Sequence, residues 1–127
     1  MERLAWVVLG SGLGGGLRYL AQLSAVALLG PAFPFGTLFV NVAGSFLIGL
    51  IMHVGLSSEI ISPNTRLFLT SGVMGGMTTY STFNYETLGF LREGALLLAG
   101  LNLVLTVILC LGAGLLGLAA GRAWVGG

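Results

Sequence analysis

Charge is the scarcest feature of this sequence. Its 127 residues include no Lys and no Asp, and charged residues make up 7% of the chain, against about 25% in a typical soluble domain. A net charge of +1 provides neither a basic patch for nucleic acid nor a strongly acidic surface. Because 56% of the residues are hydrophobic, the composition predicts a protein that lies in lipid, without a nucleic-acid partner.

The sequence has a single cysteine. It also lacks a motif typical of a catalytic triad. Cys110 is the only cysteine, so no disulfide can form within the chain. An intramembrane hydrolase that uses Ser81 and His53 would need a third partner, and none is evident. We therefore expect no catalytic residues and no enzyme activity.

The few charges separate long apolar runs. We predict one transmembrane domain over residues 1–127, with four helices at roughly residues 4–29, 36–56, 67–90 and 95–121. At a rise of about 1.5 Å per residue, helices of these lengths can cross the hydrocarbon of a bilayer. The expected loops contain Pro31 and Pro34, then Pro63, then residues 92–94. The predicted fold is an all-α membrane protein.

The third predicted helix contains the residues that favour a helix least. Residues 71–83 read SGVMGGMTTYSTF, with a glycine pair at 75 and 76, a threonine pair at 78 and 79, and several hydroxyls that compete for backbone hydrogen bonds. We predict that the helix breaks here and restarts at about Tyr80. Because broken backbone within a membrane must be covered by protein or a hydrophilic cavity, the segment predicts an ion site. The alternative is a helix-packing face of small residues.

The arginines give a weak orientation signal. Arg3, Arg66 and Arg122 would share one side of the membrane. Arg92 would lie on the other side, and Arg18, within the first helix, would lie nearer to that side. So small a positive-inside bias would allow the chain to insert in both directions. An antiparallel homodimer would then provide the inverted symmetry that larger transporters have within one chain.

Two predicted helices have polar residues spaced by four, so that each set shares one helix face. These sets are Thr37, Asn41 and Ser45 on the second helix, and Asn102, Thr106 and Cys110 on the fourth. Polar side chains at membrane depth are the first candidates for a functional path. The alternative is that each set only hydrogen-bonds to neighbouring helices.

Three ionisable residues need separate interpretation. Arg18 is always charged, so it either reaches the interface or lies in a wet vestibule that attracts anions. Glu86 could bind an ion, relay a proton or satisfy the backbone near the restarted helix, and we favour the last. His53 is expected at the interface.

The predicted break offers two kinds of ion ligand. Carbonyls freed at residues 75–78 suit a monovalent cation, because Ca²⁺ and Mg²⁺ usually need carboxylates as well. The restarted helix presents free N–H groups, the hydroxyls of Ser81 and Thr82, and the positive ring edges of Tyr80 and Phe83. These donors favour a small anion. The residues alone leave a small anion and an alkali cation open.

Four segments resemble the CrcB/Fluc family of fluoride channels: residues 15–19 (GGLRY), 36–41 (GTLFVN), 44–49 (GSFLIG) and 75–86 (GGMTTYSTFNYE). The resemblance covers most of the chain and is weakest in the fourth helix. It implies a dual-topology, antiparallel homodimer with two fluoride pores in a prokaryotic inner (plasma) membrane. It also implies passive fluoride export, which lowers fluoride toxicity, and a structural Na⁺ at the dimer centre.

The resemblance also implies roles for individual residues. The backbone oxygens of Gly75 and Thr78 would bind Na⁺, Arg18 would lie in the vestibule, and Asn102 and Thr106 loosely match a polar track. The implied pore residues are Asn41, Tyr80, Ser81, Thr82 and Phe83. At Tyr80 the family has the first of two phenylalanines, so a phenolic hydroxyl is added there. The alternative function is a small dual-topology, proton-coupled multidrug exporter, but such exporters depend on a carboxylate in the first helix, where this chain has Arg18.

Overall fold

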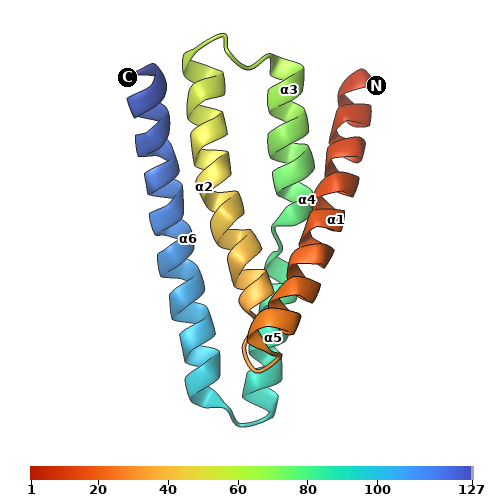
Figure 1. The fold of residues 1–127 in the computed structure, drawn as a ribbon, viewed down its shortest axis with the longest axis vertical. Helices are drawn as coiled ribbons and strands as arrows, with labels where there is room; N and C mark the ends of the chain where they lie inside the picture. Colours follow the sequence, from red (N-terminus) through yellow and green to blue (C-terminus); the bar gives the residue numbers. More distant parts are fainter. Residues whose placement is uncertain (127) are drawn as a thin grey trace.

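The computed structural model describes residues 1–126, and all its regular elements are helices, as predicted. They form four helical columns (Figure 1). The first, second and fourth are α1 (Glu2–Leu29), α2 (Phe35–Ser57) and α6 (Leu96–Val125). The third contains α3 (Pro63–Leu67), the π-helix η1 (Phe68–Met74), α4 (Gly75–Met77) and α5 (Tyr80–Arg92). The N-terminus and the C-terminal end of α6 lie at the same end of the bundle (Figure 1).

The third column begins earlier than the sequence analysis predicted. Pro63, which we expected in a loop, is the first residue of α3. The Ser62 hydroxyl accepts a hydrogen bond from the Thr65 N–H at 3.2 Å and so caps the helix. A proline fits the first helical position because its missing N–H would have no helical partner there.

The helix is interrupted at the threonine pair, whereas Gly75 and Gly76 remain helical in α4. Thr78 (ψ 156°) and Thr79 (φ −153°, ψ 119°) have extended backbone, and α5 starts at Tyr80. The glycine at 76 serves close packing instead, because a Cβ there would clash with the carbonyl of Ser11 on α1. The propensity argument named both pairs and a restart at about Tyr80, and in the structure only the threonine pair is extended.

Close helix contacts at glycine hold the columns together. On α1, a Cβ at Gly10 would lie 2.5 Å from the Phe68 carbonyl oxygen of η1. On α2, a Cβ at Gly49 would lie 2.6 Å from the Gly114 carbonyl oxygen of α6. Helix backbones approach this closely in membranes because small residues allow it. The glycines therefore fix the third column against α1, and α6 against α2.

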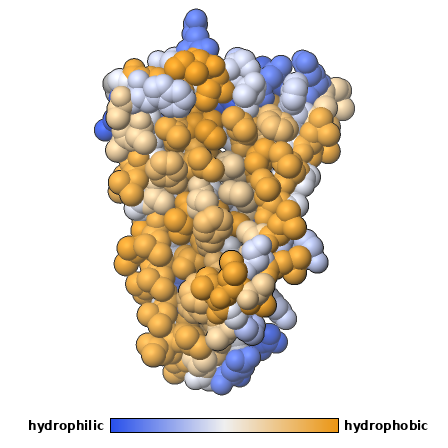
Figure 2. Space-filling model, in the orientation of Figure 1, coloured by the Kyte–Doolittle hydropathy of each residue, from blue (hydrophilic) through white to orange (hydrophobic). Residues whose placement is uncertain are grey.

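The outer surface is mainly apolar. Hydrophobic residues cover the middle of the face seen in Figure 2, and hydrophilic residues gather at its two ends. Two helices, α2 and α6, are long and apolar enough to cross a membrane by length and composition. This distribution fits a chain whose sides face lipid and whose ends face water.

Candidate functional site

The extended backbone between α4 and α5 is paired with a side chain of α2. The Thr79 N–H donates to Asn41 Oδ1 at 2.8 Å, and Asn41 Nδ2 donates to the Thr79 carbonyl oxygen at 3.1 Å. One carboxamide thus satisfies both backbone groups of a residue that is 7% exposed. Asn41, predicted as a pore residue, lies at the break and stabilises it.

The same interruption removes the helical donors of the four carbonyl groups at residues 75–78. In a continuous helix, the Thr79 N–H would donate to Gly75 and the Thr82 N–H to Thr78. Here the Thr79 N–H donates to Asn41, and the Thr82 N–H donates to the Thr79 hydroxyl at 3.1 Å. The carbonyl oxygens of Gly75 and Thr78 therefore retain lone pairs for another ligand. The resemblance implies two of these four residues, Gly75 and Thr78, as cation ligands.

The first turn of α5 presents donors and aromatic edges together. Thr79 caps this helix, and its hydroxyl lies 3.5 Å from the Ser81 hydroxyl. The rings of Tyr80 and Phe83 are tilted by 54° with centroids 5.8 Å apart. Tyr80 is 77% exposed, whereas Phe83 is 6% exposed. The first-turn N–H groups and the ring edges give this end of the helix a positive electrostatic character.

A groove of about 830 Å³ runs between α2, the third column and α6. Its lining includes Asn41, Gly75, Thr78, Tyr80, Phe83 and Thr106. The structure thus brings most of the predicted site residues to one cavity. No Asp, Glu, Lys, Arg or His lines it, so within residues 1–126 its polar groups are neutral.

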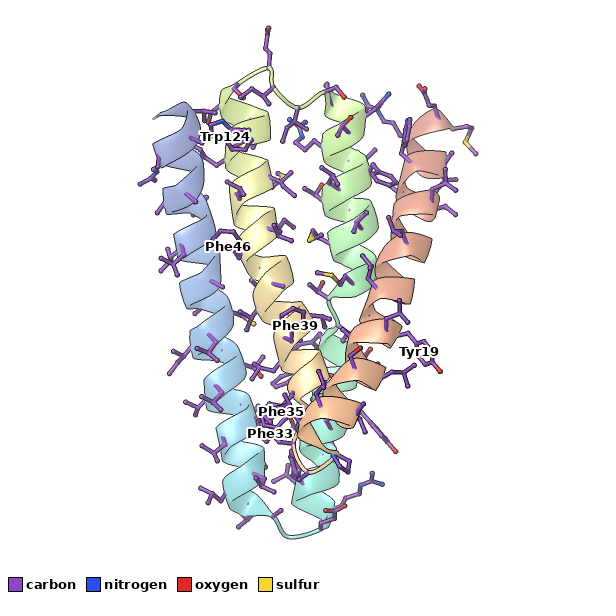
Figure 3. The ribbon with its side chains drawn as sticks, viewed as in Figure 1. Tyr19, Phe33, Phe35, Phe39, Phe46 and Trp124 are labelled. Atoms are coloured by element: carbon purple, nitrogen blue, oxygen red, sulfur yellow. The ribbon has the colours of Figure 1, made fainter. Side chains whose placement is uncertain are left out.

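Four predicted site residues do not line this groove. Ser81 and Thr82 lie in the first turn of α5 beside it, with Ser81 exposed and Thr82 half-buried. Arg18 is half-buried on α1, and the next residue, Tyr19, points outward from that helix (Figure 3). Asn102 is 1% exposed, and its Nδ2 donates to the Thr87 hydroxyl of α5 at 2.9 Å. In this chain Asn102 therefore ties α6 to α5.

Thr106 behaves differently from Asn102, although both belong to the same polar set on α6. Its side chain lines the groove, it is 9% exposed, and its hydroxyl has no hydrogen-bond partner among residues 1–126. A buried hydroxyl without a partner is costly. Thr106 therefore carries an unpaired hydroxyl that is sealed within the groove wall.

A second polar network joins three columns near α5. Gln22 Nε2 of α1 donates to the Thr37 hydroxyl at 3.2 Å, and that hydroxyl donates to Glu86 Oε2 at 2.9 Å. Glu86 thus contacts a side chain of α2, whereas we expected it to satisfy backbone near the restarted helix. The sequence analysis missed Gln22. Its spacing of four from Arg18 was the available signal, because the two share one face of α1.

The fold and the site define a class: a small, all-helical membrane protein with a groove beside an interrupted helix. Comparison with known proteins gives the family, since the model described as "CrcB-like protein, Camphor Resistance (CrcB)" matches residues 5–118. The chain belongs to this family, which confirms the resemblance described above.

Curated relatives named "Fluoride-specific ion channel FluC" match nearly the whole chain. The relative from Anaeromyxobacter dehalogenans is 54% identical over 113 residues, which cover 89% of this chain and 90% of the relative. The relative from Geotalea daltonii is 43% identical over 122 residues, covering 96% and 98%. The relative from Sorangium cellulosum is 42% identical over 127 residues, covering all of both chains.

Proposed function

We propose that this chain is a fluoride channel that lets fluoride leave the cytoplasm passively. The observation that carries the proposal is the convergence of Asn41, Phe83 and the start of α5 on one groove, in a chain whose relatives are named fluoride-specific channels. Fluoride can exchange its water for hydrogen bonds from hydroxyls, amides and first-turn N–H groups. Because the groove lacks a charged side chain, the ion is attracted without being held too tightly to leave.

The proposal includes a structural Na⁺ at the break. Supporting it, the carbonyl oxygens of Gly75 and Thr78 have lost their helical donors to Asn41 and the Thr79 hydroxyl. Carbonyl oxygens are hard ligands that suit an alkali cation. When bound, Na⁺ supplies a positive charge that offsets the carbonyl dipoles at membrane depth.

The proposal also includes a second copy of the chain, arranged antiparallel, in a prokaryotic inner membrane that all four columns cross. Supporting this, Ser71, Gly75, Tyr80 and Ser81 are exposed along the third column. Lipid does not satisfy free backbone and hydroxyl groups, so this surface needs protein or ion partners. A partner in the opposite orientation would place two such surfaces face to face and complete the cation site.

Flux from proteoliposomes tests the function. We expect the purified protein to release fluoride, to retain chloride, and to show no dependence on a proton gradient. A proton-coupled exporter would instead respond to that gradient. Absence of fluoride release, or chloride release at the same rate, would reject the proposal.

A pair of phenylalanine variants tests the site. Phe83→Ile removes the buried ring at the groove, and we expect it to abolish fluoride release while the dimer still forms on size-exclusion chromatography. Phe39→Ile makes the same chemical change at a 64% exposed position on α2, close to the height of the break (Figure 3). We expect this control to release fluoride normally. Unchanged release from Phe83→Ile would remove Phe83 from the pore lining.

A further inference from the structure

The helix that carries Phe83 is cut off from the helix before it. Thr78 and Thr79 have extended backbone, so the rotation of α5 about its own axis does not follow from that of α4. The cap at Thr79 holds the start of α5, but a single point of attachment leaves a helix free to turn about it. Because Phe83 lines the groove, a contact further along α5 must decide where its ring lies.

The buried face of α5 is small. Among the 13 residues of this helix only Phe83 and Thr87 are buried, at 6% and 5% exposed. They are four residues apart and share one face of the helix. A short helix is held in place mainly by the face that it packs against its neighbours. Since Thr87 is half of that face and is polar, its hydrogen bonds provide much of the attachment of α5 to the bundle.

Thr87 links a side chain of α6 to the backbone of Phe83. Asn102 Nδ2 donates to the Thr87 hydroxyl at 2.9 Å, and that hydroxyl donates to the Phe83 carbonyl oxygen at 2.9 Å. A hydroxyl has one proton, so the bond to Phe83 leaves the hydroxyl oxygen to accept from Asn102. Asn102 is 1% exposed, and in such low-dielectric surroundings a satisfied polar network favours a single arrangement. The bond from Asn102 therefore fixes the rotation of α5 against α6.

We propose that Asn102 and Thr87 are positioning residues for Phe83, and that their two hydrogen bonds keep its ring at the groove. Neither of them lines the groove, so they act on the ion path only through Phe83. Groups at a functional site keep their geometry when the residues behind them are held by packing and hydrogen bonds. Without the two bonds, α5 can turn about its cap and move the ring away from the groove. The effect on anion passage rests on the proposed channel function, whereas the placement of the ring does not.

Fluorine NMR of the purified protein measures the placement of the ring, with para-fluorophenylalanine introduced at position 83 alone. Thr87→Val keeps the shape of the side chain and removes the hydroxyl, so we expect the fluorine signal to shift. Thr87→Ser keeps the hydroxyl and should retain the native signal. Asn102→Leu removes only the link to α6 and leaves the bond from Thr87 to Phe83 in place. It should shift the signal as Thr87→Val does.

Fluoride release from proteoliposomes, measured per dimer without the label, gives the effect on anion passage. We expect Thr87→Val and Asn102→Leu to lose most of the release and Thr87→Ser to retain it. Gly10→Ala is the control for a general loss of stability, because its Cβ would clash with the Phe68 carbonyl oxygen in η1 and not with α5. It should melt at a lower temperature, yet keep both the native fluorine signal and the release.

The other outcomes separate this inference from the channel function. A native fluorine signal in Thr87→Val or in Asn102→Leu would overturn the positioning role, and so would an equal shift in Gly10→Ala. A shifted signal with unchanged fluoride release would overturn the effect on anion passage. A shifted signal in a protein that never releases fluoride would support the positioning role and reject the channel function. If one of the two variants fails to form a dimer, the other is judged by the same measurements.

Discussion

Replacing Asn41 tests whether the break between α4 and α5 is a stable part of the fold. In Asn41→Ala, the buried N–H and C=O of Thr79 both lose their partners. A buried polar group left unpaired costs about 1–3 kcal/mol, whereas interhelical hydrogen bonds in membranes average about 0.6 kcal/mol each. Thr79 also lines the groove, so water can replace part of what is lost. We therefore expect the free energy of unfolding to fall by about 1–3 kcal/mol in total.

The measurement is unfolding of the purified protein in mixed micelles, together with amide hydrogen exchange at residues 78–82. Exchange at Thr79 should accelerate in Asn41→Ala, because its N–H loses its acceptor. The control is Asn84→Ala, the same change at an exposed residue of α5. If Asn41→Ala and the control unfold alike and exchange at Thr79 is unchanged, the pairing does not hold the break.

Three further predictions concern packing, the polar network and the cation. Gly10→Ala should destabilise the protein by about 1–3 kcal/mol, because its Cβ would lie 2.5 Å from the Phe68 carbonyl oxygen. A Cβ at Gly12 would meet no atom within 4 Å, so Gly12→Ala should instead raise the free energy of unfolding by up to about 1 kcal/mol. Equal melting temperatures for the two variants would contradict the close packing at Gly10. Thr37→Val removes the hydrogen bond to Glu86 and should lower the melting temperature, and an unchanged value would show that this bond adds no stability. Replacing Na⁺ by a large organic cation should lower the melting temperature in a concentration-dependent way, and insensitivity would reject the structural cation.

The helical class could be predicted from the sequence, but which of the two residue pairs named for the break would leave the helix could not. Scarce charge and long apolar runs indicate membrane helices whatever the tertiary structure is. Helix propensity penalises Gly75 and Gly76, yet both are helical, and close packing against Ser11 of α1 leaves no room for a side chain at Gly76. The extended conformation falls instead on Thr78 and Thr79, where Asn41 supplies the missing partners.

Contacts between columns were the least predictable part of the site. Asn102 and Thr106 share a face of α6, but the first binds Thr87 and the second faces the groove. Residue spacing along one helix shows which side chains share a face, but not which neighbouring column each of them meets. Gln22 was missed for the same reason, since its partner Thr37 lies on another column.

The π-helical turn of η1 has a consequence for insertions and deletions. A π turn accommodates about one more residue than an α turn, so removing one residue between Phe68 and Met74 would let the column wind as a regular α-helix. The segments before and after it would keep their rotational phase, because the π turn is where one extra residue is absorbed. The same deletion in a regular helix such as α5 would instead rotate everything after it by about 100° about the column axis. One codon lost within η1 should therefore disturb the fold less than one codon lost from the regular helices of this column.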